Sequence, residues 1–363
     1  MSLTIIQKPL YKVLPASNNI MYTVEDTTSV ATKFKVKYVA DIHVISNRAN
    51  TLTASNLINT VKVSPNAVGV GILDISSILS SQVDTQRTGS TSGAGSTFKL
   101  SSNAHSIHTI DKLARDESGV TWYVVKFRVE YSDTASGVVI DSGQSVLDSA
   151  RLIYNGFLKG NDILSQSGLD YGYDLDSRGL INNDDLSGFL SNMPTTLYAR
   201  LEDFGTVSFF DDMDITNYGV SQGTNTADNK VASIKFSLYN DTIGLGVINR
   251  AVTYTGGFQT TQSDNKDVKR CFSGFYPANL KEHNTWNINE SDIVYYTVQL
   301  FDSLGLAISK MYTVNIIGDD CKGFEGIRLG WLNQYGVFDY YTFNKKSVRT
   351  ISTERQNYTQ HSG

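Results

Sequence analysis

Residues 327–343 read IRLGWLNQYGVFDYYTF and carry the strongest fold signal in the chain. Ile327, Leu329 and Trp331 alternate with an arginine and a glycine, which is the period-2 pattern of a strand with one buried face. The letters NQYG that follow predict a tight turn closed by Gly336, because glycine adopts a positive φ without steric cost. A second aromatic strand comes next and ends at a pair of lysines. The stretch therefore predicts a β-hairpin suited to packing and contact, and it contains no obvious catalyst.

The same alternation recurs along the chain. Apolar side chains occupy every second position of residues 34–44, 123–131, 234–238, 294–300 and 312–316. Such alternation is typical of antiparallel sheets with one face in water, because parallel sheets read as unbroken apolar runs. We therefore expect a mainly β protein with two antiparallel β-sandwich-like domains, a C-terminal β-hairpin and at most one short helix.

That helix is expected just after residue 74. Asp74 is a suitable N-cap, since its side chain can accept hydrogen bonds from the first backbone amides. Four apolar residues then fall on one helical face, namely Ile75, Ile78, Leu79 and Val83. No other segment shows a convincing helical period.

Composition excludes some functional classes. Charged residues make up 18% of the 363 residues, below the roughly 25% of ordinary soluble domains. The net charge of −5 argues against a nucleic-acid binder, which would carry a basic footprint. Lys33, Lys35 and Lys37 form a basic stripe, which we interpret as the solvated outer face of one strand.

Cysteine usage and hydropathy bear on the cellular compartment. Cys271 and Cys321 are too few for a secreted disulfide scaffold, and their spacing matches no zinc motif. Buried thiols are the default for both, with a bridge between them as the alternative. The N-terminus lacks the basic start and apolar run of a signal peptide, and no stretch approaches the roughly 20 apolar residues of a membrane span. We expect a protein made in a cytoplasm that stays soluble.

Segments rich in small polar residues divide the chain. A flexible loop is predicted over 84–118, which contains the run TGSTSGAGST. The predicted units are a β-domain at 1–155, a polar linker at 156–194, a second β-domain at 195–318, and the hairpin with its tail at 319–363.

Two segments resemble known functional motifs. Residues 219–223 read GVSQG and match the nucleophile elbow of serine hydrolases, but that motif needs a strand before it and a helix after it, and both flanks here are polar. Residues 174–185 carry oxygen ligands at several positions of a calcium loop. Arg178 would oppose the cation there, and Asp185 is shorter than the usual glutamate. We interpret both segments as polar loops, with calcium binding by 174–185 left open.

The remaining polar and aromatic residues fit structural roles better than catalytic ones. His105 and His108 lie in the Ser/Gly-rich segment without other metal ligands nearby, so we interpret them as surface residues. Glycoside hydrolysis needs two carboxylates facing each other across a cleft, and sequence cannot show that any pair among Asp211, Asp212, Asp214, Asp319 and Asp320 converges. The tryptophans Trp122, Trp286 and Trp331 are predicted to pack in cores or interfaces, with sugar stacking as the alternative. We expect no enzyme, no cofactor and no metal.

The hairpin also carries a family resemblance. The pattern R-L-x-W-L-N-x-x-G-x-x-D-Y-Y-T-F, preceded by the isolated Cys321, resembles the C-terminal signature of tail-associated virion proteins of tailed bacteriophages, particularly those of Bacteroidetes and marine hosts. Shorter stretches resemble the same family in the same order: PASNNI at 15–20, without the family's second proline, PN and GVGILDI between 65 and 75, YNG at 154–156 and GFLSNMP at 188–194. Together these matches span most of the chain.

The resemblance implies a structural role in a virion, assembled in the host bacterial cytoplasm. We expect a non-enzymatic component of the tail, neck or baseplate that forms a homo-oligomeric ring or sleeve and contacts other virion proteins. The alternative is a module at the tail tip that recognises a host glycan or receptor. Trp331 and Phe343 are expected to be apolar anchors, Asn333 and Gly336 to fix the turn, and Lys345 or Lys346 to dock on an acidic partner. Asp339 and Tyr341 complete the candidate interaction site.

Overall fold

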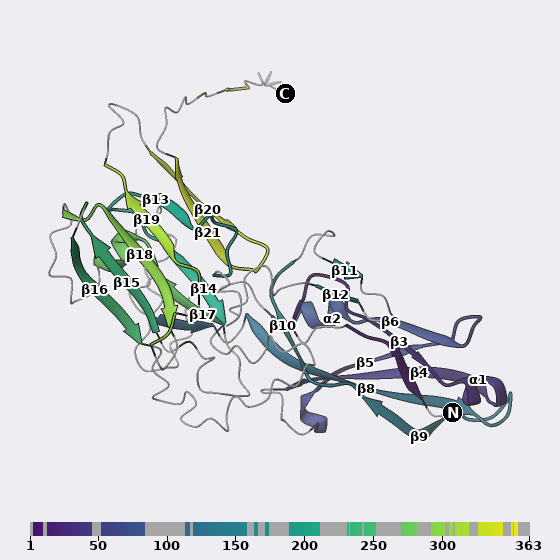
Figure 1. The fold of residues 1–363 in the computed structure, drawn as a ribbon. Helices are drawn as coiled ribbons and strands as arrows, with labels where there is room; N and C mark the ends of the chain where they lie inside the picture. The colour runs from purple at the N-terminus through teal and green to yellow at the C-terminus, as the bar shows by residue number, and fades with distance from the viewer. Residues whose placement is uncertain are drawn as a thin grey trace, which may run out of the picture.

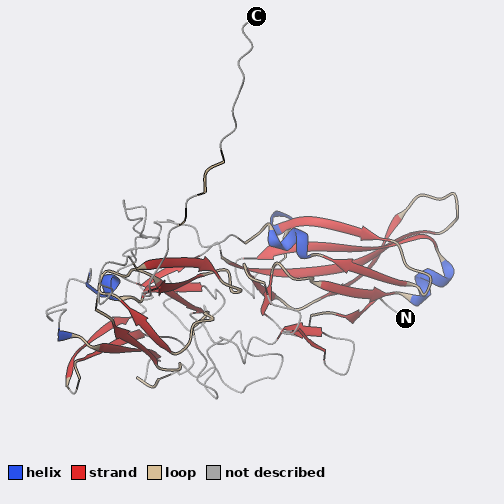
Figure 2. Ribbon diagram, turned by 90° about the horizontal axis from the view of Figure 1, so that it is seen from above, coloured by secondary structure: helices blue, strands red, loops and turns tan. Residues whose placement is uncertain are grey.

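The computed structural model describes these residues: 3–9, 13–45, 52–83, 113–116, 119–157, 163–165, 171–173, 189–210, 231, 233–241, 243–251, 270–281, 292–301, 305–307, 309–318, 326–343, 350 and 352–354. Within them the protein is mainly β, and its strands form two lobes (Figures 1 and 2). The expected fold class is confirmed. None of the helices in these ranges is long and apolar enough to cross a membrane.

The N-terminal lobe packs a six-stranded sheet against a three-stranded one. The larger sheet has the order β2-β10-β8-β4-β5, with β9 also on β8. Its strands are β2 (Val13–Pro15), β4 (Phe34–Ile45), β5 (Leu57–Val63), β8 (Val120–Ser132), β9 (Ile140–Leu147) and β10 (Arg151–Tyr154). The smaller sheet has the order β1-β3-β6, from β1 (Thr4–Gln7), β3 (Met21–Glu25) and β6 (Val70–Asp74). All these pairings are antiparallel except β2 with β10.

The alternation read from the sequence places the core of this lobe. In β8, Tyr123, Val125, Phe127 and Val129 are fully buried, as expected from their period of two. Phe127 packs across the sandwich on Tyr22 of β3, with ring centroids 5.3 Å apart. β4 departs from the expectation at its start, where Phe34 is exposed. The β4–β8 register is irregular between Phe34 and Lys37. The first residues of β4 therefore lie outside the regular part of the sheet, and the alternation does not decide their burial.

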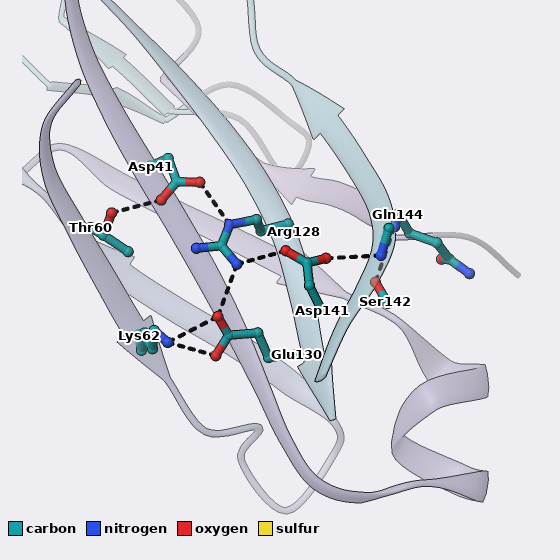
Figure 3. A network of polar contacts seen from close by, with 9 residues as sticks. Asp41, Thr60, Lys62, Arg128, Glu130, Asp141, Ser142 and Gln144 are labelled. Carbon is teal, nitrogen blue, oxygen red and sulfur yellow. Dashed lines mark hydrogen bonds and ion pairs between the residues drawn. The ribbon is translucent and has the colours of Figure 1, made fainter. Parts of the chain in front are cut away.

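The outer face of the six-stranded sheet is covered by charges (Figure 3). Arg128 of β8 lies at the centre and bridges Asp41 of β4 at 2.7 Å, Glu130 at 2.9 Å and Asp141 of β9 at 2.8 Å. Lys62 of β5 contacts Glu130 at 2.6 Å, and its hydrogen bonds hold the pKa of Glu130 below its usual value. This face is therefore polar and solvated.

A second ionic cluster is buried inside the N-terminal lobe. Arg151 donates to Asp148 at 2.8 Å, and the Tyr22 hydroxyl donates to the same carboxylate at 2.8 Å. Burial alone would raise the pKa of Asp148. The charge of Arg151 and the hydrogen bonds from Arg151 and Tyr22 outweigh that effect, so the pKa of Asp148 lies below its usual value.

The C-terminal lobe is built on a five-stranded sheet with the order β13-β19-β18-β15-β16. Its strands are β13 (Thr196–Ala199), β15 (Ser233–Tyr239), β16 (Gly244–Ala251), β18 (Tyr295–Phe301) and β19 (Tyr312–Ile316). Alternate residues of β15 and β18 are buried, as the sequence predicts, although Val294 is partly exposed just before β18. A three-stranded sheet packs near it, in the order β14-β17-β7, from β7 (Leu113–Asp116), β14 (Thr206–Phe210) and β17 (Arg270–Gly274).

β7 departs from two expectations, the flexible loop at 84–118 and the assignment of residues 1–155 to the N-terminal β-domain. It lies in the stretch 84–118 that we predict as a flexible loop, yet it pairs with β17 over four residues, Leu113 opposite Ser273 to Asp116 opposite Arg270. The N-terminal part of the chain therefore supplies a strand to the C-terminal lobe. Strand pairing to a distant segment satisfies its backbone groups, which local composition cannot reveal.

The predicted linker at 156–194 also contains ordered structure. β11 (Ile163–Ser165) and β12 (Tyr171–Tyr173) form a two-stranded hairpin. Further along, Phe189 and Leu190 are buried, and Phe189 packs on Tyr312 at 4.9 Å between ring centroids. The small polar residues of this stretch hide these short apolar segments from a composition-based prediction.

Three short helices occur in the described residues, where at most one is expected. α2 (Ser76–Ser80) is the predicted one, and Asp74 accepts from the amide of Ser76 at 3.0 Å. α1 (Thr27–Thr32) is missed because its threonines are poor helix formers, but Asp26 accepts from the amides of two residues in its first turn. α3 (Pro277–Lys281) begins at a proline, which is favoured at the first helical position. A single 3-10 turn, η1 (Ala54–Asn56), precedes β5.

Candidate functional site: the C-terminal hairpin

The hairpin predicted at 327–343 is present. β20 (Ile327–Leu332) pairs antiparallel with β21 (Phe338–Phe343), from Ile327 opposite Phe343 to Leu332 opposite Phe338. The hairpin lies on the flank of the C-terminal lobe, and its turn points towards the N-terminal lobe (Figure 1). The two strands and the turn contact different parts of the molecule.

Asn333 and Gly336 shape the turn. The Asn333 Oδ1 accepts from the amide of Tyr335 at 2.9 Å, and its Nδ2 donates to the carbonyl of Leu190 at 3.0 Å. Gly336 has φ of +68°, the left-handed conformation expected for it. Asn333 thus fixes the turn internally and ties it to the segment that precedes β13.

The turn is inserted between the two lobes. Tyr335 and Val337 are buried in the same apolar cluster as the N-terminal core. The amide of Phe157, just after β10, donates to the carbonyl of Gln334 at 2.7 Å. A Cβ on Gly336 would lie 1.5 Å from the carbonyl oxygen of Asn155, so this backbone approach requires glycine. The hairpin therefore contacts both lobes, and it reaches the N-terminal lobe with its turn.

A buried arginine holds the turn from the other side. Arg270 begins β17 and is fully buried. Its Nη1 donates to the carbonyl oxygens of Tyr335 at 3.0 Å and of Gly336 at 3.4 Å. Sequence reasoning missed this residue, because Arg270 lies far from the hairpin in sequence and a single arginine before a strand carries no distinctive signal.

The inner face of the hairpin is clamped to the C-terminal lobe. Arg328 lies over the ring of Tyr276, 4.2 Å from its centroid, and its Nη1 lies 3.2 Å from Asp203. Its Nε donates to the carbonyl of Phe204 at 2.8 Å. Thr342 on β21 accepts from Arg328 and donates to Asp203, both at 2.7 Å. The Arg328 side chain therefore faces the protein, so its charge does not shield the unpaired edge of β20.

Asp339 forms a second clamp. Its carboxylate accepts from the Ser191 hydroxyl at 2.6 Å and from the amide of Asn192 at 3.1 Å. The side chain is buried, and this burial raises the pKa of Asp339 although the hydrogen bonds oppose the shift. Asp339 contacts the same segment, 189–192, that Asn333 holds.

The opposite face of the hairpin is apolar and exposed. Trp331 is 43% exposed and Phe343 is 49% exposed, and three further large side chains on this face are 41–48% exposed, namely Ile327, Leu329 and Tyr341. We call these five residues the outer face of the hairpin. Trp331 and Phe343 were expected to be apolar anchors; within the described residues they lie on the surface, and the buried anchors are Tyr335 and Val337.

The other residues singled out from the sequence are either buried, on the surface or outside the described residues. Trp122 is buried in β8, Cys271 is buried in β17, and Lys33 bridges Asp133 at 2.5 Å on the surface. Lys345, Lys346, Cys321, Trp286 and the segments 174–185 and 219–223 lie outside the described residues, as do His105, His108, Asp211, Asp212, Asp214, Asp319 and Asp320. Across the part of the chain that is described, no three His, Cys, Asp or Glu side chains gather where they could hold a metal ion.

Comparison with known proteins assigns no family. No protein-family model matches the chain, and no curated protein matches it. Among solved structures, it is similar to part of the native conformation of E. coli alpha-2-macroglobulin, at 8% identity and a TM-score of 0.24. The match covers 91% of this chain and 17% of that one. At this TM-score the likeness carries no argument about fold or function.

Proposed function

We propose that the protein is a non-enzymatic structural component of a bacteriophage virion, in the tail, neck or baseplate, that assembles with copies of itself. The observation that carries the proposal is the two-sided hairpin. Its inner face is fixed by Arg328 and its turn by Arg270, and Asp339, opposite Trp331 in the ladder, ties the turn end of the hairpin to Ser191. Its outer face presents five large apolar side chains. Contiguous exposed apolar surface of this kind is characteristic of interaction sites.

The rest of the molecule supports an architectural role. The hairpin turn and β7 connect the two lobes in both directions, so the lobes are coupled through packed contacts. A rigid presentation of an apolar face lowers the entropy lost on association. The sequence pattern of the hairpin resembles that of tail-associated virion proteins. This resemblance is the reason for proposing that the assembly is a bacteriophage virion.

The decisive experiment is to locate the chain in particles. Purified virions of the phage that encodes it would be labelled with gold-conjugated antibody against this chain and imaged by electron microscopy. We expect label at the tail, neck or baseplate, in several copies per particle. Virions that lack the chain, although infected cells contain it, would contradict the proposal. Pre-immune antibody on the same grids is the control for label.

A second candidate is recognition of a host glycan or receptor at the tail tip. The specific observation in its favour is the exposure of Trp331 and Tyr341 on one face, since aromatic rings form platforms on which sugars stack. This candidate predicts saturable binding of the purified protein to host envelope material, and loss of that binding in Trp331→Ala. Binding that is equal in both proteins would remove this surface as the receptor site.

A further inference from the structure

We infer that the outer edge of β20 pairs with the same edge of a second copy, in an antiparallel, two-fold register centred on Gly330. This inference rests on the self-assembly part of the proposed function and specifies which surface and which residues meet. The occupant is a second copy of this chain, because the β20 edge has outward hydrogen-bonding groups, lacks the usual protection of an edge strand and can place its own residues opposite one another.

The hydrogen bonds of the turn show which backbone groups of β20 point away from β21. The amide of Asn333 donates to the carbonyl of Val337 at 2.8 Å, so these two opposed residues form a hydrogen-bonded pair. Such pairs alternate along an antiparallel ladder. In the register of β20 with β21, Trp331, Leu329 and Ile327 direct their backbone groups to β21. The backbone N–H and C=O groups of Leu332, Gly330 and Arg328 then point away from β21, and no strand in the described ranges pairs with that side.

The β20 edge lacks the features that protect other edges. Exposed edge strands are usually shielded by charges, bulges or short length. β5 carries Lys62 on its edge, and β16 has an irregular register at Tyr239 and a glycine at 246 with φ of 155°. β20 has six residues in regular register with β21, and its one charge, Arg328, is directed inward to Asp203.

The residues on this edge are self-complementary. If Gly330 lies on a two-fold axis, its outward groups bond to those of its own copy, and Arg328 and Leu332 pair across the axis in the same way. Trp331 is then opposite Leu329 of the second copy, on the apolar side of both strands. Glycine at the axis removes any side-chain collision where the two backbones meet. Aromatic–aliphatic pairs opposite each other stabilise sheets by about 0.2–1 kcal/mol each.

The size of the contact sets its expected strength. Trp331, Leu329, Ile327 and Leu332 are 41–48% exposed, so each offers on the order of 80 Å² to a partner. Two copies would bury about 600 Å² of side-chain surface, which is below the range of stable specific interfaces and corresponds to a weak, transient contact. The pair is therefore expected at high micromolar concentration of the isolated protein. Because an isologous contact closes at two copies, a ring or sleeve would need a second contact elsewhere.

The test uses the full-length protein and sedimentation velocity over about 1–500 µM, a range that covers weak association. Wild type is expected to shift from monomer to dimer. Leu329→Glu and Trp331→Lys each place a charge in the apolar pair and should weaken dimerisation by about tenfold or more. Val247→Lys is the matched control, since Val247 is an exposed apolar residue on the edge strand β16 and its substitution should leave the dimer unchanged. Circular dichroism checks that each variant is folded.

A mixing experiment tests the register itself. In the proposed arrangement, residue 329 of one copy faces residue 331 of the other. Mixing the Leu329→Glu and Trp331→Lys proteins should therefore restore a dimer, because opposite charges then meet across the axis. A wild type that stays monomeric, edge variants that dimerise as wild type does, or a mixture that stays monomeric would each overturn the inference. Variants that assemble like wild type would leave the virion proposal intact, whereas absence of the chain from particles would overturn that proposal and leave the pairing untouched.

Discussion

Gly336→Ala is the sharpest test of how the two lobes are joined. Gly336 has φ of +68°, and an alanine Cβ would lie 1.5 Å from the carbonyl oxygen of Asn155. A separation under 3.0 Å cannot be accommodated, and the obstructing atom belongs to backbone. The turn must therefore move away from the N-terminal lobe, and Tyr335 and Val337 must leave their buried positions.

The cost can be worked from those contacts. Exposing a fully buried large apolar side chain costs about 1.5–3 kcal/mol, and both Tyr335 and Val337 are at least 98% buried. Undocking also breaks the hydrogen bond between Phe157 and Gln334, worth about 1 kcal/mol. The expected loss is about 4–7 kcal/mol, a large part of the roughly 5–15 kcal/mol that stabilises a typical protein.

Gly143→Ala is the matched control. Gly143 also has a positive φ, +73°, but nothing lies within 4 Å of the position of its Cβ. Its substitution should cost only the backbone strain, about 1–2 kcal/mol. Both variants would be unfolded in guanidinium and followed by tryptophan fluorescence, with free energies from linear extrapolation. If the two variants lose the same stability, the insertion of the turn between the lobes does not contribute as described.

Three further substitutions test other contacts. Arg151→Met should destabilise the protein by up to about 3–5 kcal/mol, because Asp148 then loses its buried ion-pair partner and is left with the more exposed Lys8, 3.4 Å away, and the Tyr22 hydroxyl; adding Asp148→Leu should recover much of this loss in the same unfolding assay. Asp339→Asn tests pH dependence: since the folded pKa of Asp339 is raised above its ordinary value of 3.8, the stabilisation linked to its protonation is complete below that value and is lost as pH rises through the folded pKa. The variant should therefore lose less stability than wild type between about pH 4 and 7, and an identical pH profile would contradict the assignment. Trp331→Ala should cost less than the roughly 3–5 kcal/mol of a core tryptophan, because 43% of the residue is exposed; a loss in that range would show that this ring is part of the folded core.

Local patterns were sufficient for the long strands and the hairpin, but not for the short strands β7, β11 and β12. The alternation in β8 and the glycine in the hairpin turn are properties of neighbouring residues, and the structure contains both. α1 was missed because its threonines conceal a helix that depends on a single capping carboxylate, Asp26. Such a cap also occurs in turns, so its presence alone does not predict a helix.

The hairpin was predicted from sequence, but its covered and exposed faces are the reverse of those that the alternation indicates. Aromatic content identified the hairpin, and the period of two placed Trp331 on one face and Arg328 on the other. It could not show which face the protein covers, because that depends on Tyr276 and Asp203, which lie more than 50 residues away in sequence. Charged residues normally lie on the solvated face, but here Arg328 faces the protein, where it pairs with a carboxylate and an aromatic ring.

The reciprocal exchange between the lobes has a consequence for synthesis on the ribosome. β7 leaves the ribosome early, but it can pair only after β17 has been synthesised. The core of the N-terminal lobe is complete only after Tyr335 and Val337 have been synthesised. Neither lobe reaches its final packing until the last tenth of the chain has emerged. A nascent chain stalled before residue 335 should therefore remain open to proteases at the junction, even though most strands of its N-terminal lobe have already been made.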